Sequence, residues 1–263
     1  MRRLGFSILA VAILGSLTPA QDSVTITSDP HDLSRPVSTL INQIRQRERI
    51  SITYEDPRYR NSGDTEDVTA EVSRGSEVEK AYGPRILVPR GHSITFVYAP
   101  TEMRILEGSK LVIERMLQEY ASLGGPAFAV VGDGDRLHVV PSEISDHSGV
   151  RRAEDSILNA MISIVPAARN GGELLEAICE EVQKQTGYEI GIGPSVPGNY
   201  LAAYKTSAGI GRKSARSAIA ELLDRASVRG SFDWDLYYDP SDRAYMLNFS
   251  YVGPAGPVER TAK

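Results

Sequence analysis

Histidine is the side chain most often used for proton transfer and metal binding near neutral pH. The chain has four, at His31, His92, His138 and His147. No two of them have the spacing of a metal-binding helix or of a zinc loop. We therefore interpret them as scattered surface residues and predict no metal site. His138 is expected to alternate away from the apolar residues beside it in a strand.

Paired carboxylates are the second group that could do chemistry, because two of them can share the acid and base roles in cleaving a glycan. Glu55/Asp56 and Glu180/Glu181 are such pairs. Neighbouring residues of a strand point to opposite faces of a sheet, which separates Glu55 from Asp56. Glu180 and Glu181 are predicted on a solvated helix face. We therefore expect neither pair to be catalytic.

Two acidic turns could bind calcium, which prefers several oxygen ligands on a flexible loop. They are Asp133/Asp135 and Asp239/Asp242. Each offers few ligands and lacks the twelve-residue pattern of a calcium loop, whereas hairpin turns favour Asp for backbone reasons. We interpret both as turns without a metal.

Cys179 is the only cysteine, so no disulfide can form within the chain. It lies in a helical pattern, where a small buried core residue is expected. The sequence has no Gly-x-Ser-x-Gly elbow, no phosphate-binding loop and no dinucleotide fingerprint. It therefore predicts no catalytic residue, no cofactor-binding residue and no cofactor. This favours a non-catalytic protein and leaves the enzyme alternative open.

Residues 1–20 have the pattern of a cleaved signal peptide. Two arginines precede an apolar run from Leu4 to Leu17, and small residues precede a cleavage point before Gln21. A membrane anchor is the alternative, but the run falls short of the roughly 20 residues that span a bilayer. Cleavage removes two arginines and no acid, which moves the net charge from −5 to −7. We expect a soluble periplasmic or secreted protein, and the acidic balance argues against a nucleic-acid partner.

One structural unit is written twice in the chain. An amphipathic helix runs straight into a β-hairpin at about 109–141 and again at about 214–252. In the second hairpin, apolar residues alternate with polar ones in the period of a strand with one buried face: Phe232, Trp234, Leu236 and Tyr238. This duplication indicates a modular scaffold more than a catalytic pocket.

Two further helices, beginning near Pro36 and after Gly172, lead into strands at 50–54 and 188–192. More strands are predicted at 94–98 and 158–164. Ser34 and Ser109 are candidate caps of the first and second helices. These elements predict an α+β fold of two tandem small modules with helices packed on small sheets. Each module reads approximately as β-α-β followed by β-α-β-β.

The predicted boundary lies near residues 142–155, where the composition is polar and rich in turn residues. The first module covers 21–145 and includes a long polar loop at 56–91, which a short strand at 68–72 interrupts. The second module covers 155–252. Residues 253–263 are predicted to form a flexible tail.

Two segments of the second module, Glu173–Ile192 and Ser214–Phe249, share a recognisable order. A leucine-rich helix leads through QTGYEI in one and through ELLDRAS to FDWDLYYDPSDRAYMLNF in the other. This order resembles the short N-terminal (STN) domain shared by secretins and TonB-dependent receptors. The resemblance consists of apolar spacing and turns, and it covers the N-terminal half only loosely. It implies a periplasmic, non-catalytic domain that acts in protein contact or signal relay, and no functional residue is carried over.

The leading hypothesis is therefore an exported, soluble protein that binds another envelope or secreted protein through an open sheet edge. The predicted contact surface is the polar side of the final hairpin together with the loop at 56–91. Two alternatives stay open, namely a hydrolase or other enzyme with a site between the two modules and a carrier of a small ligand in a cleft there.

Overall fold

The computed structural model describes residues 23–28, 35–59, 64–72, 85–90, 92–145, 148, 150–227 and 230–253. The predicted signal peptide at 1–20 and most of the predicted tail lie outside these residues. Within them the fold is α+β, as the sequence predicts, and no helix is long and apolar enough to cross a membrane.

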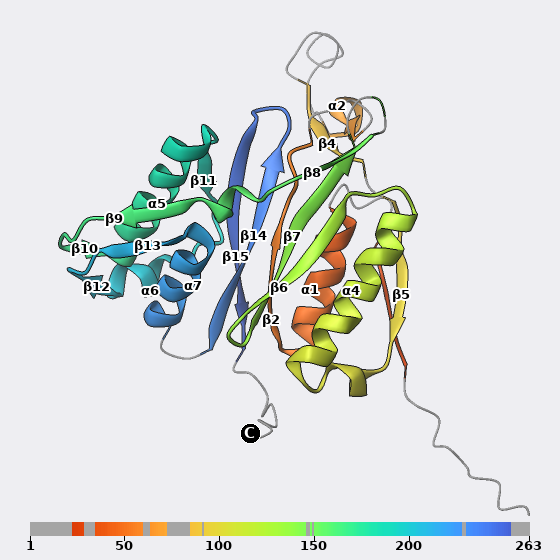
Figure 1. Ribbon diagram of the computed structural model, residues 1–263, viewed down its shortest axis with the longest axis horizontal. Helices are drawn as coiled ribbons and strands as arrows, with labels where there is room; N and C mark the ends of the chain where they lie inside the picture. The colour runs from red at the N-terminus through yellow and green to blue at the C-terminus, as the bar shows by residue number, and fades with distance from the viewer. Residues whose placement is uncertain are drawn as a thin grey trace, which may run out of the picture.

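One large sheet forms the centre of the molecule (Figure 1). Its strand order is β11-β15-β14-β2-β7-β6, and β8 pairs with the end of β7. The strands are β11 (Ile190–Ile192), β15 (Ala244–Val252), β14 (Ser231–Asp239), β2 (Ser51–Glu55), β7 (Arg136–Ser145), β6 (Ala127–Asp133) and β8 (Arg151–Ala153).

Four two-stranded sheets accompany it. They pair β1 (Val24–Thr27) with β5 (Thr95–Tyr98), β3 (Thr65–Asp67) with β4 (Leu87–Pro89), β9 (Met161–Ile164) with β13 (Ile210–Ser214), and β10 (Arg169–Asn170) with β12 (Lys205–Thr206).

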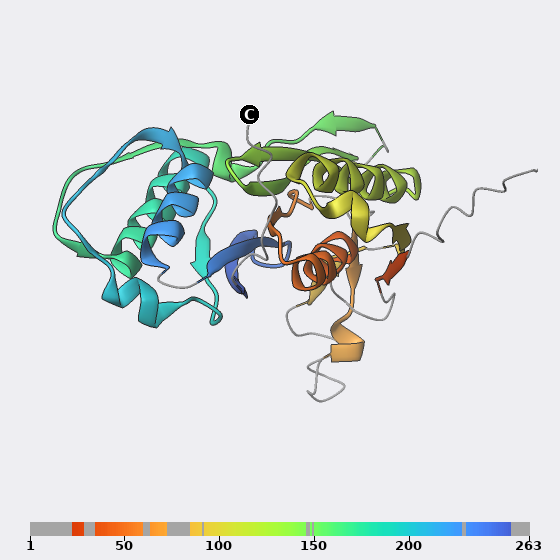
Figure 2. The same ribbon diagram turned by 90° about the horizontal axis from the view of Figure 1, so that it is seen from below.

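The helices cover opposite faces of the central sheet. The helices α1 (Pro36–Glu48) and α4 (Leu106–Ser122) lie on one side, and α5 (Gly171–Thr186), α6 (Gly198–Ala203) and α7 (Ala215–Ala226) lie on the other (Figures 1 and 2). Short helical turns occur at α2 (Thr69–Val72), η1 (Pro100–Met103) and η2 (Ile157–Asn159). Each group of helices encloses its own buried apolar cluster, because successive residues of a strand point to opposite faces.

The two halves of the chain have the same topology. In each half a helix leads into a first strand, as α1 into β2 and α5 into β11. A second helix then leads into a hairpin, as α4 into β6–β7 and α7 into β14–β15. In both halves the first strand pairs in parallel with the second strand of the hairpin. The helix–hairpin duplication predicted from the sequence is therefore present, and β6 corresponds to β14 as β2 does to β11.

The sheet runs without interruption across the predicted module boundary. The outer edge of β14 pairs in parallel with β2, where Asp235 and Leu236 lie beside Tyr54 and Glu55. The two apolar clusters lie on either side of this seam. The predicted modules thus have separate cores, but they share one sheet.

Several local predictions are wrong. The predicted strand at 68–72 is instead the helical turn α2, preceded by strand β3. Ser109 does not cap its helix, because α4 begins earlier, at Leu106, and the Ser109 hydroxyl donates to the Met103 carbonyl. The strand predicted at 158–164 is split into η2 and β9. Helix α1 begins after Arg35 as its N-cap residue, and the predicted cap Ser34 lies outside the described residues.

Candidate functional site

The paired carboxylates of β2 lie in the sheet, at the seam between the halves. The Glu55 side chain is fully buried on the face covered by α7. It accepts two hydrogen bonds from the guanidinium of Arg216, at 2.7 and 2.8 Å, and one from the Ser156 hydroxyl. Such a bidentate pair holds a carboxylate in one place. Glu55 therefore fixes α7 against β2, and its oxygens are already occupied.

Asp56 is equally buried and equally occupied. It accepts hydrogen bonds from the Tyr54 hydroxyl at 2.6 Å, from the backbone N–H of Tyr238 at 2.9 Å and from the Arg35 guanidinium. Burial raises the pKa of Asp56, while Arg35 and these donors favour the charged form. Glu55 and Asp56 both join the two halves.

On the polar side of the final hairpin two residues of β14 are also buried, which corrects part of the predicted contact surface, whereas on β15 Met246 is exposed and Asn248 and Ser250 are half-buried. Asp233 and Asp235 of β14 are covered by α1, although strand alternation had placed them towards solvent. Asp235 accepts a hydrogen bond of 2.9 Å from Arg45, and Asp233 accepts one of 2.8 Å from the backbone N–H of Ile52. Arg136 reaches Asp233 at 3.4 Å. The alternation is real, but the second face packs on the other half of the protein.

His138 is buried beneath α7, so its prediction as a surface residue is wrong. Its Nδ1 lies 2.7 Å from the Thr53 hydroxyl, and its ring lies against the ring of Trp234. Among the described residues neither Nε2 of His138 nor the indole N–H of Trp234 has a hydrogen-bond partner. Burial lowers the pKa of His138 to about 3, and the charges of Arg216 and Arg136 act in the same direction. The imidazole is therefore neutral at physiological pH.

The remaining candidate residues that the structure describes do not come together in one site. His92 is exposed, and His31 and His147 lie outside the described residues. At the second acidic turn, the Asp239 carboxylate accepts hydrogen bonds from the backbone of Ser241 and Asp242, as a turn residue does. No group of three or more potential metal ligands comes together in the described part of the chain.

Cys179 and the pair Glu180/Glu181 have the environments that the sequence predicts. The Cys179 thiol is buried in the second core, and burial raises its pKa to about 12, which keeps it protonated and unreactive. Glu180 is exposed on α5, and the Glu181 carboxylate binds Lys184 at 3.4 Å on the helix surface.

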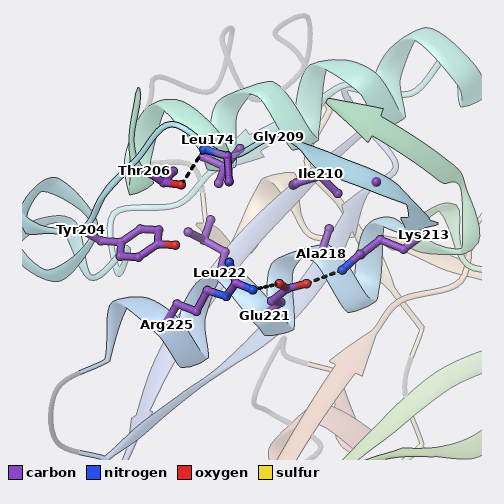
Figure 3. Close-up of a pocket in the computed structure, with 12 residues that line it drawn as sticks. Leu174, Tyr204, Thr206, Gly209, Ile210, Lys213, Ala218, Glu221, Leu222 and Arg225 are labelled. Atoms are coloured by element: carbon purple, nitrogen blue, oxygen red, sulfur yellow. Dashed lines mark hydrogen bonds and ion pairs between the residues drawn. The ribbon is translucent and has the colours of Figure 1, made fainter. Parts of the chain in front are cut away.

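The hollows of the surface lie within one half or the other. A cavity of about 50 Å³ lies between α5, α7 and β13 (Figure 3). A water molecule occupies about 30 Å³ in the liquid, so this space suits water more than an organic ligand. At its mouth Glu221 forms ion pairs with both Lys213 and Arg225. One carboxylate thus pairs with two cations at this cavity.

A wider hollow of about 480 Å³ lies between α6 and α7, lined by Tyr200, Tyr204 and Arg225 among others. Another, of about 40 Å³, lies near Tyr59 and His92 in the first half. Their linings come from residues 199–226 and from residues 59–144, respectively. The cleft between modules that the enzyme and carrier alternatives require is not among these hollows, and the seam contains paired buried charges.

The two edges of the central sheet are β6 and β11, not the final hairpin. Each strand of that hairpin has a neighbour on both sides over part of its length: β14 pairs with β15 and, at Asp235 and Leu236, with β2, and β15 pairs with β14 and, at residues 245–247, with β11. The loop predicted at 56–91 contacts the final hairpin, where the backbone N–H of Leu87 donates a hydrogen bond of 3.1 Å to the Ser241 hydroxyl.

The β6 edge is the candidate interaction site. Within the described residues β6 pairs with β7 alone, along its whole length. Six residues, from Ala127 to Gly132, precede the first charge at Asp133 and include no proline. Val130 is buried towards α4, whereas Ala129 and Val131 are exposed on the other face, Val131 by 43%. The edge is thus long, uncharged and partly apolar.

Edge strands usually carry protection against unwanted pairing, in the form of short length, charge, proline or bulges. The opposite edge, β11, has only three residues. Strand β8, which pairs with the end of β7, begins with Arg151 and Arg152. The middle of β6 has none of these protections, and its single register irregularity lies at its start, between Ala127 and Phe128.

The sequence predicts the first hairpin but not that one of its strands is outermost. The useful signal is the run AFAVVG, which is uncharged and rich in strand-forming residues. Strand order depends on the long-range pairing of β14 with β2, which local patterns do not encode. No family model, curated protein or solved structure matches the chain.

Proposed function

We propose that this protein is an exported, non-catalytic interaction module that binds other proteins by adding their extended segments to the edge of β6. In this mode, main-chain hydrogen bonds supply affinity and alternate side chains supply specificity. The observation that carries the proposal is the open edge itself, seven residues long and uncharged until its last residue.

The side chains beside the edge define the kind of segment that fits. Ala129 and Val131 present a small apolar surface on one face, and nothing lies within 4 Å of where a side chain would begin at Gly132. A partner strand with a β-branched or aromatic residue on that face would cover Val131 and remove its apolar area from water. A charged residue there would lose hydration without gaining an ion pair.

Export and the protein-binding role are consistent with each other. The predicted signal peptide at 1–20 would deliver the chain to the periplasm or the exterior, and the resemblance to the short N-terminal domain of secretins and TonB-dependent receptors suggests protein contact. The occupied carboxylates and the neutral, buried His138 also favour binding over catalysis.

Site-specific photo-crosslinking in the native host tests this function. A photoreactive phenylalanine analogue replaces Val131 on the edge or, as the control, Met161, an exposed residue of β9. We expect the probe at 131 to form a discrete adduct with a different protein of the envelope or the medium, and the probe at 161 to form none. The exported chain should begin at Gln21.

Two results would contradict the proposal. One is the absence of an adduct at 131 in cells that export the protein normally, and the other is the same adduct at both positions. An adduct at 131 should also weaken at least several-fold when Ala129→Lys is introduced, because a lysine on an edge strand opposes pairing.

A further inference from the structure

The internal duplication offers two ways for copies of this chain to associate at β6. Inside the molecule, β14 of the second half pairs with β2 of the first half. In the first way, two copies repeat this pairing with the corresponding strands, so that β6 of one copy pairs with β11 of another. This head-to-tail contact would propagate into filaments. In the second, β6 of two copies pair with each other in an antiparallel, two-fold contact. The charges at the seam distinguish the two.

The two halves can be placed in register by their helix ends. Arg49 and Gly187 both end a helix in the left-handed conformation, with the N–H of each bonded four residues back. Counting onward, the buried residues Ile52 and Ile190 of the first strands then coincide. Counting back four residues places Gln183 of α5 where α1 has Arg45.

The internal seam depends on charge pairs that a head-to-tail contact would lack. Arg45 of α1 reaches across the seam to Asp235 of β14, at 2.9 Å. The corresponding strand β6 has no carboxylate before Asp133, and α5 has an exposed Gln183 and an exposed Glu180 on its outer surface. Repeating the seam would lay an acidic helix against a strand that offers no cation, so the charges oppose it.

The antiparallel contact meets no such conflict. With Val130 at the two-fold axis, Ala129 lies opposite the partner's Val131, and Asp133 lies opposite the partner's Ala127. On this face the exposed Ala129 and Val131 are apolar in both copies, and the two exposed Asp133 carboxylates lie at opposite ends of the ladder. Small apolar cross-strand pairs stabilise such a sheet, and no like charges face each other.

We infer that a second copy of this chain occupies the β6 edge when no other partner is present, so that two central sheets join in one two-fold dimer. This rests on the proposed use of the β6 edge and names its resting occupant. Pairing with a second copy and pairing with another protein are mutually exclusive. Formation of the dimer therefore competes with partner binding, most strongly at high protein concentration.

Sedimentation velocity and light scattering of the chain from Gln21 onward test this inference over a wide concentration range. We expect reversible dimers. Val131→Lys should weaken dimerisation about tenfold or more, since two lysines would be desolvated in one small contact. Val97→Lys, at an exposed valine of β5, is the matched control and should leave the dimer unchanged. Circular dichroism establishes that both variants fold.

Cysteine cross-linking identifies the contact. The variant Ala129→Cys/Val131→Cys should form disulfides between position 129 of one copy and position 131 of the other upon oxidation, while the buried Cys179 stays reduced. In the alternative variant Ala129→Cys/Ile192→Cys, a disulfide between positions 129 and 192 of two copies would show the head-to-tail contact and overturn the inference.

A chain that stays monomeric at its highest attainable concentration would overturn the inference, as would a dimer that Val131→Lys leaves intact. Neither result bears on the proposed function, which depends on the adduct at position 131 with a different protein. Conversely, a dimer through β6 without such an adduct would support self-association and contradict the proposed function.

Discussion

At the scale of residues, buried ion pairs are the main feature that joins the two halves. Three arginines, Arg45, Arg136 and Arg216, reach from one half to carboxylates of the other. All three are nearly inaccessible to solvent. Such pairs add little net stability compared with apolar packing, but a charge left without its partner is costly. They therefore specify which strand edges meet at the seam.

The pair of Arg45 and Asp235 tests this reasoning. Asp235→Ala should lower the free energy of unfolding by about 3–5 kcal/mol, because it leaves the buried guanidinium of Arg45 with only its longer contact to Asp233, at 3.4 Å. The double variant Arg45→Met/Asp235→Leu should recover most of that loss by replacing the pair with apolar side chains. Urea denaturation monitored through Trp234 measures both. If the double variant loses as much stability as the sum of the losses from changing Arg45 alone and Asp235 alone, the two side chains contribute independently of each other. The pair would then not specify which strand edges meet.

His138 makes stability depend on pH. Its pKa is about 3 in the folded protein and 6.5 as the reference value for the unfolded chain, so below pH 6.5 the unfolded state binds the extra proton. This stability is fully present above pH 6.5 and is lost as the pH falls towards 3. We expect a loss of about 2 kcal/mol between pH 7 and pH 5.

The control for this prediction is His138→Gln, which keeps a polar group beside Thr53 and does not titrate in this range. The difference in unfolding free energy between the two proteins should shrink by about the same 2 kcal/mol from pH 7 to pH 5. A difference that stays constant would mean that His138 is accessible to protons in the folded state. Asp56 and Asp233 titrate in the wild type and in His138→Gln alike, so their contribution cancels in the difference between the two unfolding free energies.

At the scale of elements, the local sequence predicts the helices and hairpins, because these elements are determined by residues close together in the chain. The hairpins β6–β7 and β14–β15 and the helices α1, α4, α5 and α7 all follow from apolar spacing and turn residues. Ser214 caps α7, since its side chain accepts the N–H of Ser217. These features depend on contacts between near neighbours in sequence, which a pattern can encode.

The faces of the strands are the part that local chemistry predicts wrongly. Polar residues on β2 and β14 were expected towards solvent, because alternation distinguishes two faces but does not say what covers each. Glu55, Asp233 and Asp235 are buried because each faces an arginine at least 97 residues away in sequence. Without knowledge of those distant arginines, the polar face of a strand cannot be told from a buried ionic face.

The same limit applies to the candidate site. The run AFAVVG is visible in the sequence, but its exposure depends on β14 pairing with β2 and leaving β6 outermost. The final hairpin has the stronger aromatic pattern, and its polar side was predicted as the contact surface. The strength of the aromatic pattern instead reflects an interior position with partners on both sides.

At the scale of the whole molecule, the seam determines whether the halves can exist separately. Each half has its own apolar core, which alone would suggest two independent domains. Separation would expose Arg45 and Glu55 in one half and Arg216, Asp233 and Asp235 in the other, each without its main partner. Separation would also break the pairing of β14 with β2, so each half would lose a neighbouring strand of its sheet together with these charge pairs.

We therefore predict that residues 21–147 and 150–263, produced separately, each fail to unfold cooperatively, and that they recover a single sharp transition when they are mixed. A chain with a protease site between 147 and 150, cut after folding, is the matched control and should stay associated, because the seam holds the pieces together. Far-ultraviolet circular dichroism follows both pieces, and fluorescence of Trp234 follows the second. If the second piece alone unfolds at the same urea concentration as the intact chain, the buried charges at the seam do not couple the halves, and the shared sheet merely joins two independent domains.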